Sequence, residues 1–532
     1  MKITPSFEPV PQSIDIHEHL KDWNGACLVC LLKARANATP DRLYFSCDEV
    51  EITFGELWER AGRVALALSK RGVTSGMRVG ILAHNSVDLL VLLHACYRLG
   101  AISASLNVSV GPVDLEYLVD HLDPSHLIFS DELAEKHAER LETLGRSFQP
   151  VRIRELQAEQ GTLETEHCWE PLDLTWILYS GATTGRPKGM MIPHVRSAHN
   201  ARRLTRALST NRSDRFYSAL QMSHGWLPLT VLTMCLLNGI PCGTTRWFSA
   251  TRWLSQVRDF RGTLVDPFLP MTGALTAKPP SADDRNHSVR LAIGAYGTLI
   301  EYPRRQAFEE RFGITTINVY GQSELGSVVC YEDPRARVPG SSGLPDQDFE
   351  IAIADGLVPT RKPGVSGEIL VRTNHAGHLA LGYLKDPERT VKSWQDLWVH
   401  TSDFGYFDEE GRLYLKGREA FWIRRKSENV SAYEVEEAIR QLPQVADVAV
   451  VGVPSEMGDE EIKAFILLKD GDPLTAPEIH RRLSDSISFF KVPRFIQFAA
   501  ELPRTIKGEI DRKTLKESSF DRELWDAQSI RR

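Results

Sequence analysis

The chain has 532 residues, of which 42% are hydrophobic and 25% charged, and its formal net charge is −7. This length is too great for one hydrophobic core and predicts about three to four structural units of an ordinary globular enzyme. The acidic balance argues against nucleic acid as a partner, because no basic surplus is present to neutralise a phosphate backbone. The first residues lack the apolar core of a signal peptide and no segment has the length and hydropathy of a membrane span, so we expect a cytoplasmic protein without a membrane partner.

Up to the region of Gly417, helix patterns and strand patterns alternate. Thr53 is a predicted N-cap and Gly100 a predicted helix end, because a threonine hydroxyl accepts backbone N–H bonds and glycine tolerates the left-handed conformation at a helix terminus. The predicted helices cover residues 54–68, 87–99 and 115–122, and the predicted buried strands cover residues 78–82, 126–129 and 174–178. Repeated βα units predict parallel sheets covered by helices. Later in the chain, the sequence predicts strands of a smaller, more antiparallel β unit at residues 364–372 and 411–415.

The pattern changes near Gly417 and Arg418. Beyond this point the sequence predicts a helix, two strands, a helix and a short strand, at residues 432–442, 445–453, 463–469, 477–488 and 494–498. These elements make a domain of a size that folds alone. The predicted fold class is α/β: a large N-terminal domain (1–417) of helix-covered parallel sheets with a small β unit, followed by a small α+β C-terminal domain (418–532).

Eight cysteines are scattered along the chain without the spacing of metal ligands. Cys27 and Cys30 form a single C-x-x-C pair inside an apolar run that reads as a helix. Core packing is therefore favoured for this pair over redox chemistry or zinc binding.

The most informative segment runs from Tyr179 to Gly189 and combines small, hydroxyl-bearing and glycine residues with a lysine. Its glycines, Thr183, Thr184 and Lys188 suit a polyphosphate, since backbone N–H groups, hydroxyls and an ammonium group all donate to phosphate oxygens. The spacing excludes a P-loop, because Lys188 follows a proline and precedes glycine and methionine rather than serine or threonine. A plain surface turn stays open as the other interpretation.

Further candidate residues follow along the chain. Tyr320 could stack on a flat base, and Glu324, just after Ser323, is an acid suited to a magnesium ion. Asp403 ends a Thr-Ser-Asp run and could accept two ribose hydroxyls, and Arg418 opens the small domain. Alone, each has an ordinary explanation as a core aromatic residue, a solvated acid, a turn residue or a surface charge, and that explanation is preferred.

In combination, these motifs and the Leu-Pro-Arg-Thr run at residues 502–505 occur in the order and approximate spacing of the adenylate-forming (ANL) superfamily, which includes acyl-CoA synthetases, firefly luciferase and peptide-synthetase adenylation domains. The chain resembles this superfamily over nearly its whole length. Residues 424–431 are most similar to the corresponding run of carnitine-type acyl-CoA ligases, which favours coenzyme A as the second partner. The resemblance implies that a carboxylate attacks the α-phosphate of ATP to give acyl-AMP, that a thiol then displaces AMP, and that a mobile C-terminal domain swings between the steps.

The resemblance also implies roles for individual residues. The adenylate-binding residues would be Thr183, Thr184 and Lys188 at the phosphates, the backbone of 294–297 including Gly297 and the ring of Tyr320 at adenine, Ser323, Glu324 as the Mg²⁺ ligand, and Asp403 and Arg418 at the ribose. The acyl pocket would include His224, Trp226, Ala295 and Tyr296, with Phe268 nearby. The coenzyme A site would be formed by Arg424, Lys426, Ser427, Glu428 and Asn429, and Phe421 stands at the hinge position. The predicted catalytic positions are His224, Ser427 and Glu509.

Several of these positions depart from the superfamily pattern. The late motif resembles Leu-Pro-Arg-Thr-x-x-Gly-Lys, but Glu509 stands in place of the lysine that clamps the acid and α-phosphate oxygens. Losing one such group typically costs about 10²- to 10³-fold in rate, and a carboxylate adds repulsion. The other departures are Gly181 and Ala182 for serine and glycine in the phosphate loop, Ser402 and Ser427 for glycines, and Phe421 for the aspartate or lysine of the hinge.

These changes predict that the second half-reaction, from acyl-AMP and coenzyme A to acyl-CoA and AMP, is retained while adenylation is weak or absent. A separate adenylating enzyme would then supply the adenylate. Two alternatives stay open: a complete ATP-dependent ligase in which Lys507 replaces the missing lysine, and a pseudoenzyme that only binds acyl-adenylate. The loss of the lysine is similar to that in the non-adenylating acyl-CoA ligase of platensimycin-type diterpenoid pathways. The aromatic residues around the acyl site favour an aromatic or polycyclic acid.

Overall fold

The computed structural model describes residues 27–109, 112–143, 148–180, 187–296, 302–356, 358–418, 422–425, 428–455, 460–469, 474–487, 491–504, 510–518 and 524–527. It is a mixed α/β structure with the large N-terminal part and smaller C-terminal part that the sequence predicts. Within these residues, no helix combines the length and the apolar character needed to span a bilayer.

The first N-terminal sheet is parallel apart from its last strand. Its spatial order is β6 (Gln149–Arg152), β5 (His126–Phe129), β3 (Arg78–Leu82), β4 (Ile102–Ser105), β7 (Leu174–Ser180) and β8 (Lys188–Pro193). The predicted strands over 78–82, 126–129 and 174–178 are confirmed. Strand β8 runs antiparallel to β7, with Ser180 opposite Lys188. The predicted phosphate loop therefore joins two neighbouring strands.

The second N-terminal sheet carries the central motifs. Its order is β15 (Leu344–Pro345), β14 (Ser327–Tyr331), β13 (Thr316–Gln322), β12 (Leu291–Gly294), β11 (Leu264–Val265), β9 (Phe216–Ser218), β10 (Cys242–Thr244), β1 (Leu43–Cys47) and β2 (Val50–Thr53). The strands from β13 to β1 are parallel, and the edges are antiparallel.

Helices pack on these sheets. They are α2 (Leu28–Ala38), α3 (Phe54–Lys70), α4 (Val87–Leu99), α5 (Pro112–Leu122), α6 (Asp131–Thr143), α7 (Ile153–Gln157), α8 (Val195–Leu208), the π-helical turn η1 (Leu227–Val231), α9 (Leu232–Asn238), α10 (Trp253–Asp259), α11 (Leu269–Thr276) and α12 (Tyr302–Phe312). The predicted cap of α3 is confirmed: the Thr53 hydroxyl accepts the N–H of Glu56, and the Glu56 carboxylate accepts the N–H of Thr53. Gly100 ends α4 at φ +75°, as predicted.

A third sheet is antiparallel, as predicted for this part of the chain. It contains β17 (Val358–Thr360), β16 (Phe349–Asp355), β18 (Gly367–Thr373), β20 (Trp398–Phe407), β19 (Trp394–Gln395) and β21 (Leu413–Arg418), and α13 (Pro387–Ser393) lies between β18 and β19 in the chain. Strands β18 and β21 begin later than predicted. Gly364 and Gly411, the predicted first residues, have φ +76° and +79° and lie in the preceding turns.

In its described residues, the C-terminal part forms a hairpin, a four-stranded sheet and three helices. The hairpin pairs β22 (Trp422–Arg425) with β23 (Glu428–Ser431); the sheet is β24 (Val445–Pro454), β25 (Glu460–Leu468), β26 (Phe495–Phe498) and β27 (Trp525–Asp526); and the helices are α14 (Ala432–Arg440), α15 (Ala476–Ser486) and α16 (Arg512–Glu517). Apolar residues between Ile423 and Ile496 build a core separate from the main core of the N-terminal part. The boundary at 417/418 stays a prediction.

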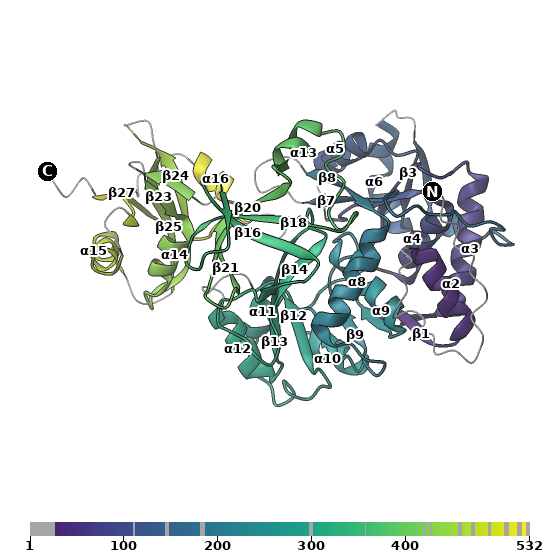
Figure 1. Ribbon diagram of the computed structural model, residues 1–532, viewed down its shortest axis with the longest axis horizontal. Helices are drawn as coiled ribbons and strands as arrows, with labels where there is room; N and C mark the ends of the chain where they lie inside the picture. Colours follow the sequence, from purple (N-terminus) through teal and green to yellow (C-terminus); the bar gives the residue numbers. More distant parts are fainter. Residues whose placement is uncertain are drawn as a thin grey trace.

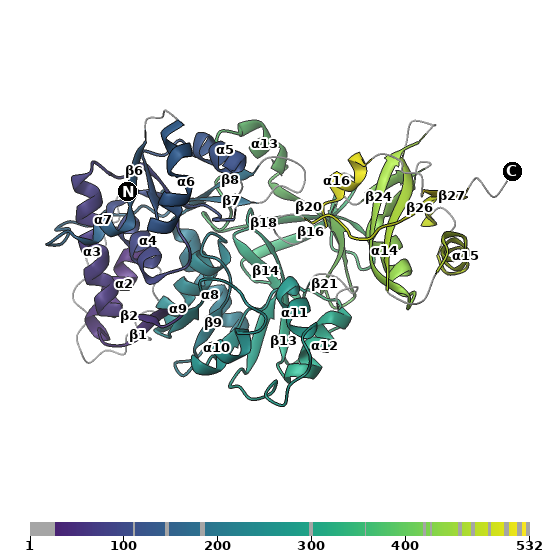
Figure 2. The ribbon, with the colours of Figure 1, turned by 180° about the vertical axis from the view of Figure 1, so that it is seen from behind.

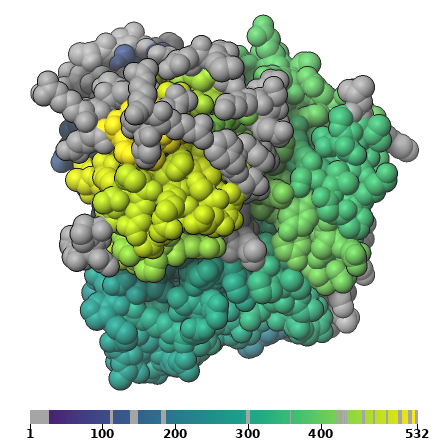
Figure 3. All heavy atoms as spheres, turned by 90° about the vertical axis from the view of Figure 1, so that its left-hand side faces the viewer, coloured from purple at the N-terminus to yellow at the C-terminus, as the bar shows by residue number. Residues whose placement is uncertain are grey.

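The two parts lie side by side along the long axis of the molecule. Figures 1 and 2 both place α14, β24 and α15 at one end, beyond the sheet of β16, β18 and β20, and α2 and α3 at the other end. Seen from the C-terminal end, the yellow and yellow-green residues stand in front of a teal and green surface formed by earlier parts of the chain (Figure 3). The third sheet thus lies between the main N-terminal sheets and the C-terminal sheet.

Candidate active site

The end of β13 needs a glycine and places Tyr320 in the interior. A side chain at Gly321 would meet the carbonyl oxygen of Ser327 at 1.7 Å, so only glycine allows the β13–β14 hairpin to close here. Tyr320, 3% exposed, donates its hydroxyl to the Oδ2 atom of Asp403 over 3.1 Å. The predicted adenine and ribose residues are therefore direct neighbours, although 83 positions separate them in the chain.

Asp403 is the centre of a small polar group. The amide of Gln322 donates to its Oδ2 at 2.5 Å and to the carbonyl of Thr401 at 2.9 Å. Arg418 lies opposite Asp403 in the β20–β21 pairing, which places the two predicted ribose residues in register; the side chain of Arg418 lies outside the described part. Gln322 was not predicted as a site residue, although it lies inside the run from Tyr320 to Glu324 that carries the predicted motif.

Ser402, which stands where the superfamily has glycine, adopts the left-handed conformation with φ +57°. Its N–H donates to Glu368 at 2.8 Å, and Glu368 also contacts the imidazole of His400 at 2.8 Å. A residue with a Cβ atom is strained in this region, which explains why glycine suits the position. The chain keeps the turn that positions Asp403 in spite of this strain.

A second polar group brings together Glu324, Lys188 and Tyr383. The hydroxyl of Tyr383 donates to the Oε1 atom of Glu324 at 2.8 Å, and the ammonium of Lys188 lies 5.8 Å from the centre of the Tyr383 ring. Burial, followed by the charge of Glu324, raises the pKa of Tyr383, so this hydroxyl stays a donor at neutral pH. The predicted phosphate and magnesium residues therefore meet at a tyrosine that sequence reasoning missed.

Arg196 supports the same segment from α8. Its guanidinium donates to the carbonyl of Ser323, the residue before Glu324, and its side chain is almost fully buried. Burial lowers the pKa of Arg196 to about 9, and the arginine stays charged at neutral pH. Arg196 thus anchors the turn that presents Glu324.

The residues fit a magnesium ion that is held partly by phosphates. Among the described residues there is no group of three or more His, Cys, Asp or Glu side chains that could hold a metal by themselves. A single carboxylate, Glu324, suits Mg²⁺, which typically takes one or two protein carboxylates and completes its shell with water and substrate phosphates. When bound, such an ion would neutralise phosphate charge.

The predicted acyl residues Trp226 and His224 both lie beside Phe268. The rings of Trp226 and Phe268 meet edge to face with centroids 5.7 Å apart, and the ring of His224, which is exposed, lies 6.2 Å from that of Phe268. Tyr296 is 1% exposed and donates its hydroxyl to the carbonyl of Pro267 at 3.2 Å, whereas Ala295 is exposed. The rings of His224, Trp226 and Phe268 thus lie together, and their role in acyl binding stays a prediction.

An acid that the sequence did not mark lies behind this aromatic group. Asp266 directly follows β11, is 2% exposed, and accepts hydrogen bonds at Oδ2 from the indole of Trp226 and the hydroxyl of Ser218, both at 2.8 Å. Burial raises the pKa of Asp266 to about 8, because these hydrogen bonds do not offset the desolvation of a carboxylate. Asp266 is therefore mostly protonated at neutral pH and orients Trp226.

The predicted coenzyme A residues lie on the β22–β23 hairpin. Arg424 pairs with Asn429, and Arg425 pairs with Glu428. Arg425 fastens this hairpin to the rest of the C-terminal part, since its guanidinium contacts Glu461 at 2.6 Å and the carbonyl of Val492 at 2.7 Å. Of the remaining predicted positions, those outside the described residues are Thr183, Thr184, Gly297, Phe421, Lys426, Ser427, Lys507 and Glu509, together with the side chains of Arg424, Glu428 and Asn429.

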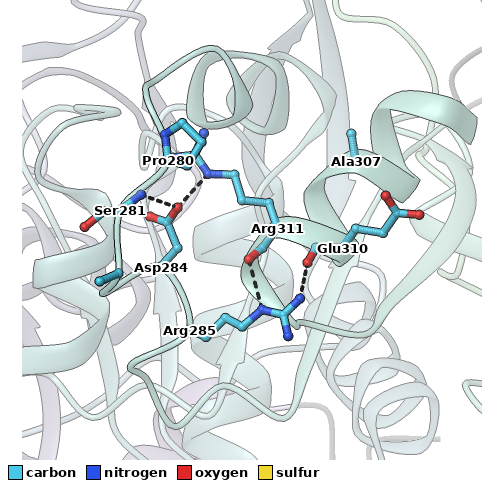
Figure 4. Close-up of a pocket in the computed structure, with 8 residues that line it drawn as sticks. Pro280, Ser281, Asp284, Arg285, Ala307, Glu310 and Arg311 are labelled. Carbon is cyan, nitrogen blue, oxygen red and sulfur yellow. Dashed lines mark hydrogen bonds and ion pairs between the residues drawn. The ribbon is translucent and has the colours of Figure 1, made fainter.

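A surface hollow elsewhere on the molecule has no relation to these groups. It lies between α12 and the segment around residue 284, and Figure 4 shows its lining residues. Arg311 contacts Asp284 at 2.8 Å, and Arg285 donates to the carbonyl groups of Arg311 and Glu310. These arginines fasten a loop to a helix, and none of the predicted site residues lines the hollow.

Comparison with known proteins identifies the family. The AMP-binding enzyme family matches residues 32–384, and the AMP-binding enzyme C-terminal domain matches residues 434–509. The chain belongs to the AMP-binding enzyme family. The first match contains Lys188, Tyr320 and Glu324, and the second ends at Glu509.

Curated relatives of this family member include crotonobetaine/carnitine–CoA ligases. That of Shigella flexneri is 27% identical over 479 residues, covering 87% of this chain and 92% of its own, and that of Proteus mirabilis is 27% identical over 485 residues, covering 88% and 93%. Among solved structures, ATP-bound MatB from Rhodopseudomonas palustris has a TM-score of 0.83 at 24% identity, covering 92% of this chain and 98% of its own. O-succinylbenzoate CoA synthetase (MenE) from Bacillus subtilis with its acyl-adenylate OSB-AMP has a TM-score of 0.81 at 24% identity and the same coverage. These structures confirm the predicted fold class.

Proposed function

We propose that this AMP-binding enzyme is an acyl-CoA ligase that mainly performs the thioesterification half-reaction, in which acyl-AMP and coenzyme A give acyl-CoA and AMP. The observation that carries the proposal is Glu509, an acid at the position where the superfamily pattern has its late lysine. The coenzyme A ligases among the relatives support the choice of thiol. Arg504 and Ile510, the described residues on either side of Lys507 and Glu509, form an antiparallel bridge.

The two half-reactions place different demands on the chain. In adenylation, a substrate carboxylate attacks the α-phosphorus and pyrophosphate leaves, so negative charge crowds the reacting centre. A cation there lowers the barrier, whereas a carboxylate about 4 Å away adds on the order of 4 kcal/mol of repulsion in partly screened surroundings. In thioesterification, the thiolate of coenzyme A attacks the acyl carbonyl carbon and AMP leaves. That step needs the adenylate to be held, and the group formed by Tyr320, Gln322 and Asp403 offers the polar contacts for it.

The acyl group of the proposed substrate is aromatic or polycyclic. Trp226 and Phe268 offer an edge-to-face pair of rings, and Asp266, protonated at neutral pH, leaves the interior behind them uncharged. An apolar, flat acid matches such surroundings better than a charged chain. A separate adenylating enzyme in a pathway of secondary metabolism, of the platensimycin type, would supply this adenylate.

The test separates the half-reactions with one acid. Synthetic aryl and polycyclic acyl-adenylates, with benzoyl-AMP as the first, are incubated with coenzyme A, and the thioester is measured by mass spectrometry. The acid whose adenylate reacts is then used in ATP–pyrophosphate exchange. We expect thioester formation with little exchange in the wild type, and exchange that rises about 10²-fold or more in Glu509→Lys.

Two variants control for the alternatives. Glu509→Gln removes the repulsion without adding a cation, so it should fall between the wild type and Glu509→Lys. Fast wild-type exchange that Lys507→Ala abolishes would establish the complete ligase instead. No thioester from any adenylate, in a protein that still binds the adenylates, would establish a binding protein without catalysis.

A further inference from the structure

The start of α2 carries two thiols that the proposed ligase reaction does not use. The helix begins at Leu28, so Cys27 is its N-cap rather than part of the predicted helical run. The Cys27 sulfur accepts the N–H of Cys30 at 3.3 Å, as a serine hydroxyl does in an ordinary cap. This bond holds the Cys27 sulfur against the backbone of Cys30, so the two cysteines share the first turn of the helix. Both pack partly buried against the main core, as core packing predicts.

Residues far along the chain complete this environment. His194, just before α8, accepts the N–H of Leu28 at its Nε2 atom (3.2 Å), which places the imidazole beside the first turn of α2. The imidazole is fully buried and stacks on Trp169 with 4.5 Å between ring centres. Its Nδ1 atom has no hydrogen-bond partner within the described ranges. Cys168, beside Trp169, is exposed and lies close enough to influence the charge of Cys30.

This environment gives the two thiols different ionisation. Hydrogen bonding from Cys30 lowers the pKa of the Cys27 thiol in spite of its burial. The hydrogen bond to Cys27 and burial raise the pKa of Cys30. Both side chains are partly exposed. A thiolate beside a protonated thiol is the arrangement that thiol–disulfide exchange requires.

We propose that Cys27 and Cys30 form a thiol–disulfide exchange site for low-molecular-weight disulfides. The Cys27 thiolate attacks one sulfur of the small disulfide, which forms a mixed disulfide and releases one small thiolate. Cys30 then loses its proton to solvent and attacks the Cys27 sulfur, and the second small thiolate leaves. The cysteine pair is oxidised by two electrons to an internal disulfide, and the small disulfide is reduced by two electrons to two thiols.

Zinc binding is the competing explanation for the same residues. Cys27, Cys30, Cys168 and His194 are ligand types that zinc accepts. However, no group of three or more such side chains is arranged to hold a metal within the part of the chain that the structure describes. In addition, the Nε2 atom of His194 already accepts the N–H of Leu28. Thiol–disulfide exchange needs only the two cysteines, Cys27 and Cys30, which share the first turn of the helix.

The first experiment maps the products of oxidation. Reduced full-length protein is incubated with oxidised glutathione, the remaining thiols are alkylated, and peptides are identified by mass spectrometry. The wild type should yield a Cys27–Cys30 disulfide. Cys30→Ser should stop at glutathione bound to Cys27, and Cys27→Ser, which keeps a good N-cap residue, should leave Cys30 unmodified. Cys168→Ser is the matched control and should leave the Cys27–Cys30 disulfide unchanged.

The second experiment measures reactivity. At pH 6, iodoacetamide should alkylate Cys27 about tenfold faster than Cys168, because the larger thiolate fraction outweighs the lower intrinsic nucleophilicity of a weakly basic thiolate. Modification of Cys168 alone, with Cys27 and Cys30 still reduced, would overturn the proposal. One equivalent of zinc in the purified protein, lost in Cys27→Ser, would assign the residues to a metal instead.

Discussion

Replacement of Asp266 by asparagine should change how the stability of the protein depends on pH. Burial raises the pKa of this carboxyl from its ordinary 3.8 to about 8, so the folded state keeps a proton that the unfolded chain has lost across this range. Because the folded state binds more protons, the contribution of Asp266 to the free energy of unfolding is most favourable below the ordinary pKa and falls as the pH rises toward 8. An amide at position 266 keeps an oxygen for Trp226 and Ser218 but does not ionise.

The size of the effect follows from the two pKa values. A shift of about four units corresponds to about 5 to 6 kcal/mol over the whole range, at 1.36 kcal/mol per unit. About 3 to 4 kcal/mol of this total falls between pH 5 and pH 8. The free energy of unfolding of Asp266→Asn, relative to the wild type, should therefore rise by that amount across this interval. Given the entropy of unfolding of a large domain, this free energy corresponds to a change of roughly 4 °C in the Tm difference between the variant and the wild type.

The assay compares Tm of the two proteins at pH 5, 6, 7 and 8. Asp214→Asn is the matched control, because Asp214 is buried to the same degree but has the opposite ionisation. Burial opposes its charge, yet hydrogen bonds from Arg290, the Asn211 N–H and Thr263 keep its pKa below the ordinary value. The stabilising effect of ionised Asp214 is lost only in acid. The Tm difference between Asp214→Asn and the wild type should therefore stay constant from pH 5 to 8. A flat difference for Asp266→Asn as well would refute the argument and show an ionised Asp266.

Three further variants probe the candidate active site. Ser402→Gly removes the strain of φ +57° and should stabilise the protein by about 0.5 to 1 kcal/mol in thermal unfolding. A loss of stability would mean that a contact of the serine side chain stabilises the protein by more than the backbone strain destabilises it. Tyr320→Phe removes the hydroxyl that donates a hydrogen bond to Asp403, so it should weaken AMP binding about fivefold, as measured by calorimetry. Unchanged affinity would show that this hydrogen bond does not contribute to nucleotide binding. In a Glu509→Lys background, Glu324→Gln should lower ATP–pyrophosphate exchange by about 10-fold or more and spare thioester formation from acyl-AMP, and equal losses in both reactions would contradict a role confined to the ATP step.

Local chemistry explains which parts of the fold could be predicted. The start of α3 depends on Thr53 and Glu56, three positions apart, and the end of α4 depends on Gly100. Hydrogen bonds of this kind are complete within one turn of chain, so the sequence determines them before any packing occurs. The alternation of βα units similarly predicts parallel sheets, because only crossover connections join parallel strands. The errors at β18 and β21 arose where a glycine turn was read as the start of a strand.

The candidate site was predicted residue by residue but not as an arrangement. Its motif residues Tyr320, Asp403, Glu324 and Lys188 could be named from the sequence, because each belongs to a short run with a recognisable pattern. Their partners could not be named. Tyr383, which contacts Glu324, lies 59 positions further along the chain and has no motif of its own.

By itself, the sequence determined the helix ends, the alternating elements, the family resemblance and the acid at position 509. Only the tertiary structure decided that Asp266 is buried behind Trp226 and that His194 lies on the cap of α2, 166 positions from Leu28. The reason is physical: caps and turns are formed by neighbours in the chain, whereas burial and pKa depend on which distant strands and helices the sheet order brings into contact.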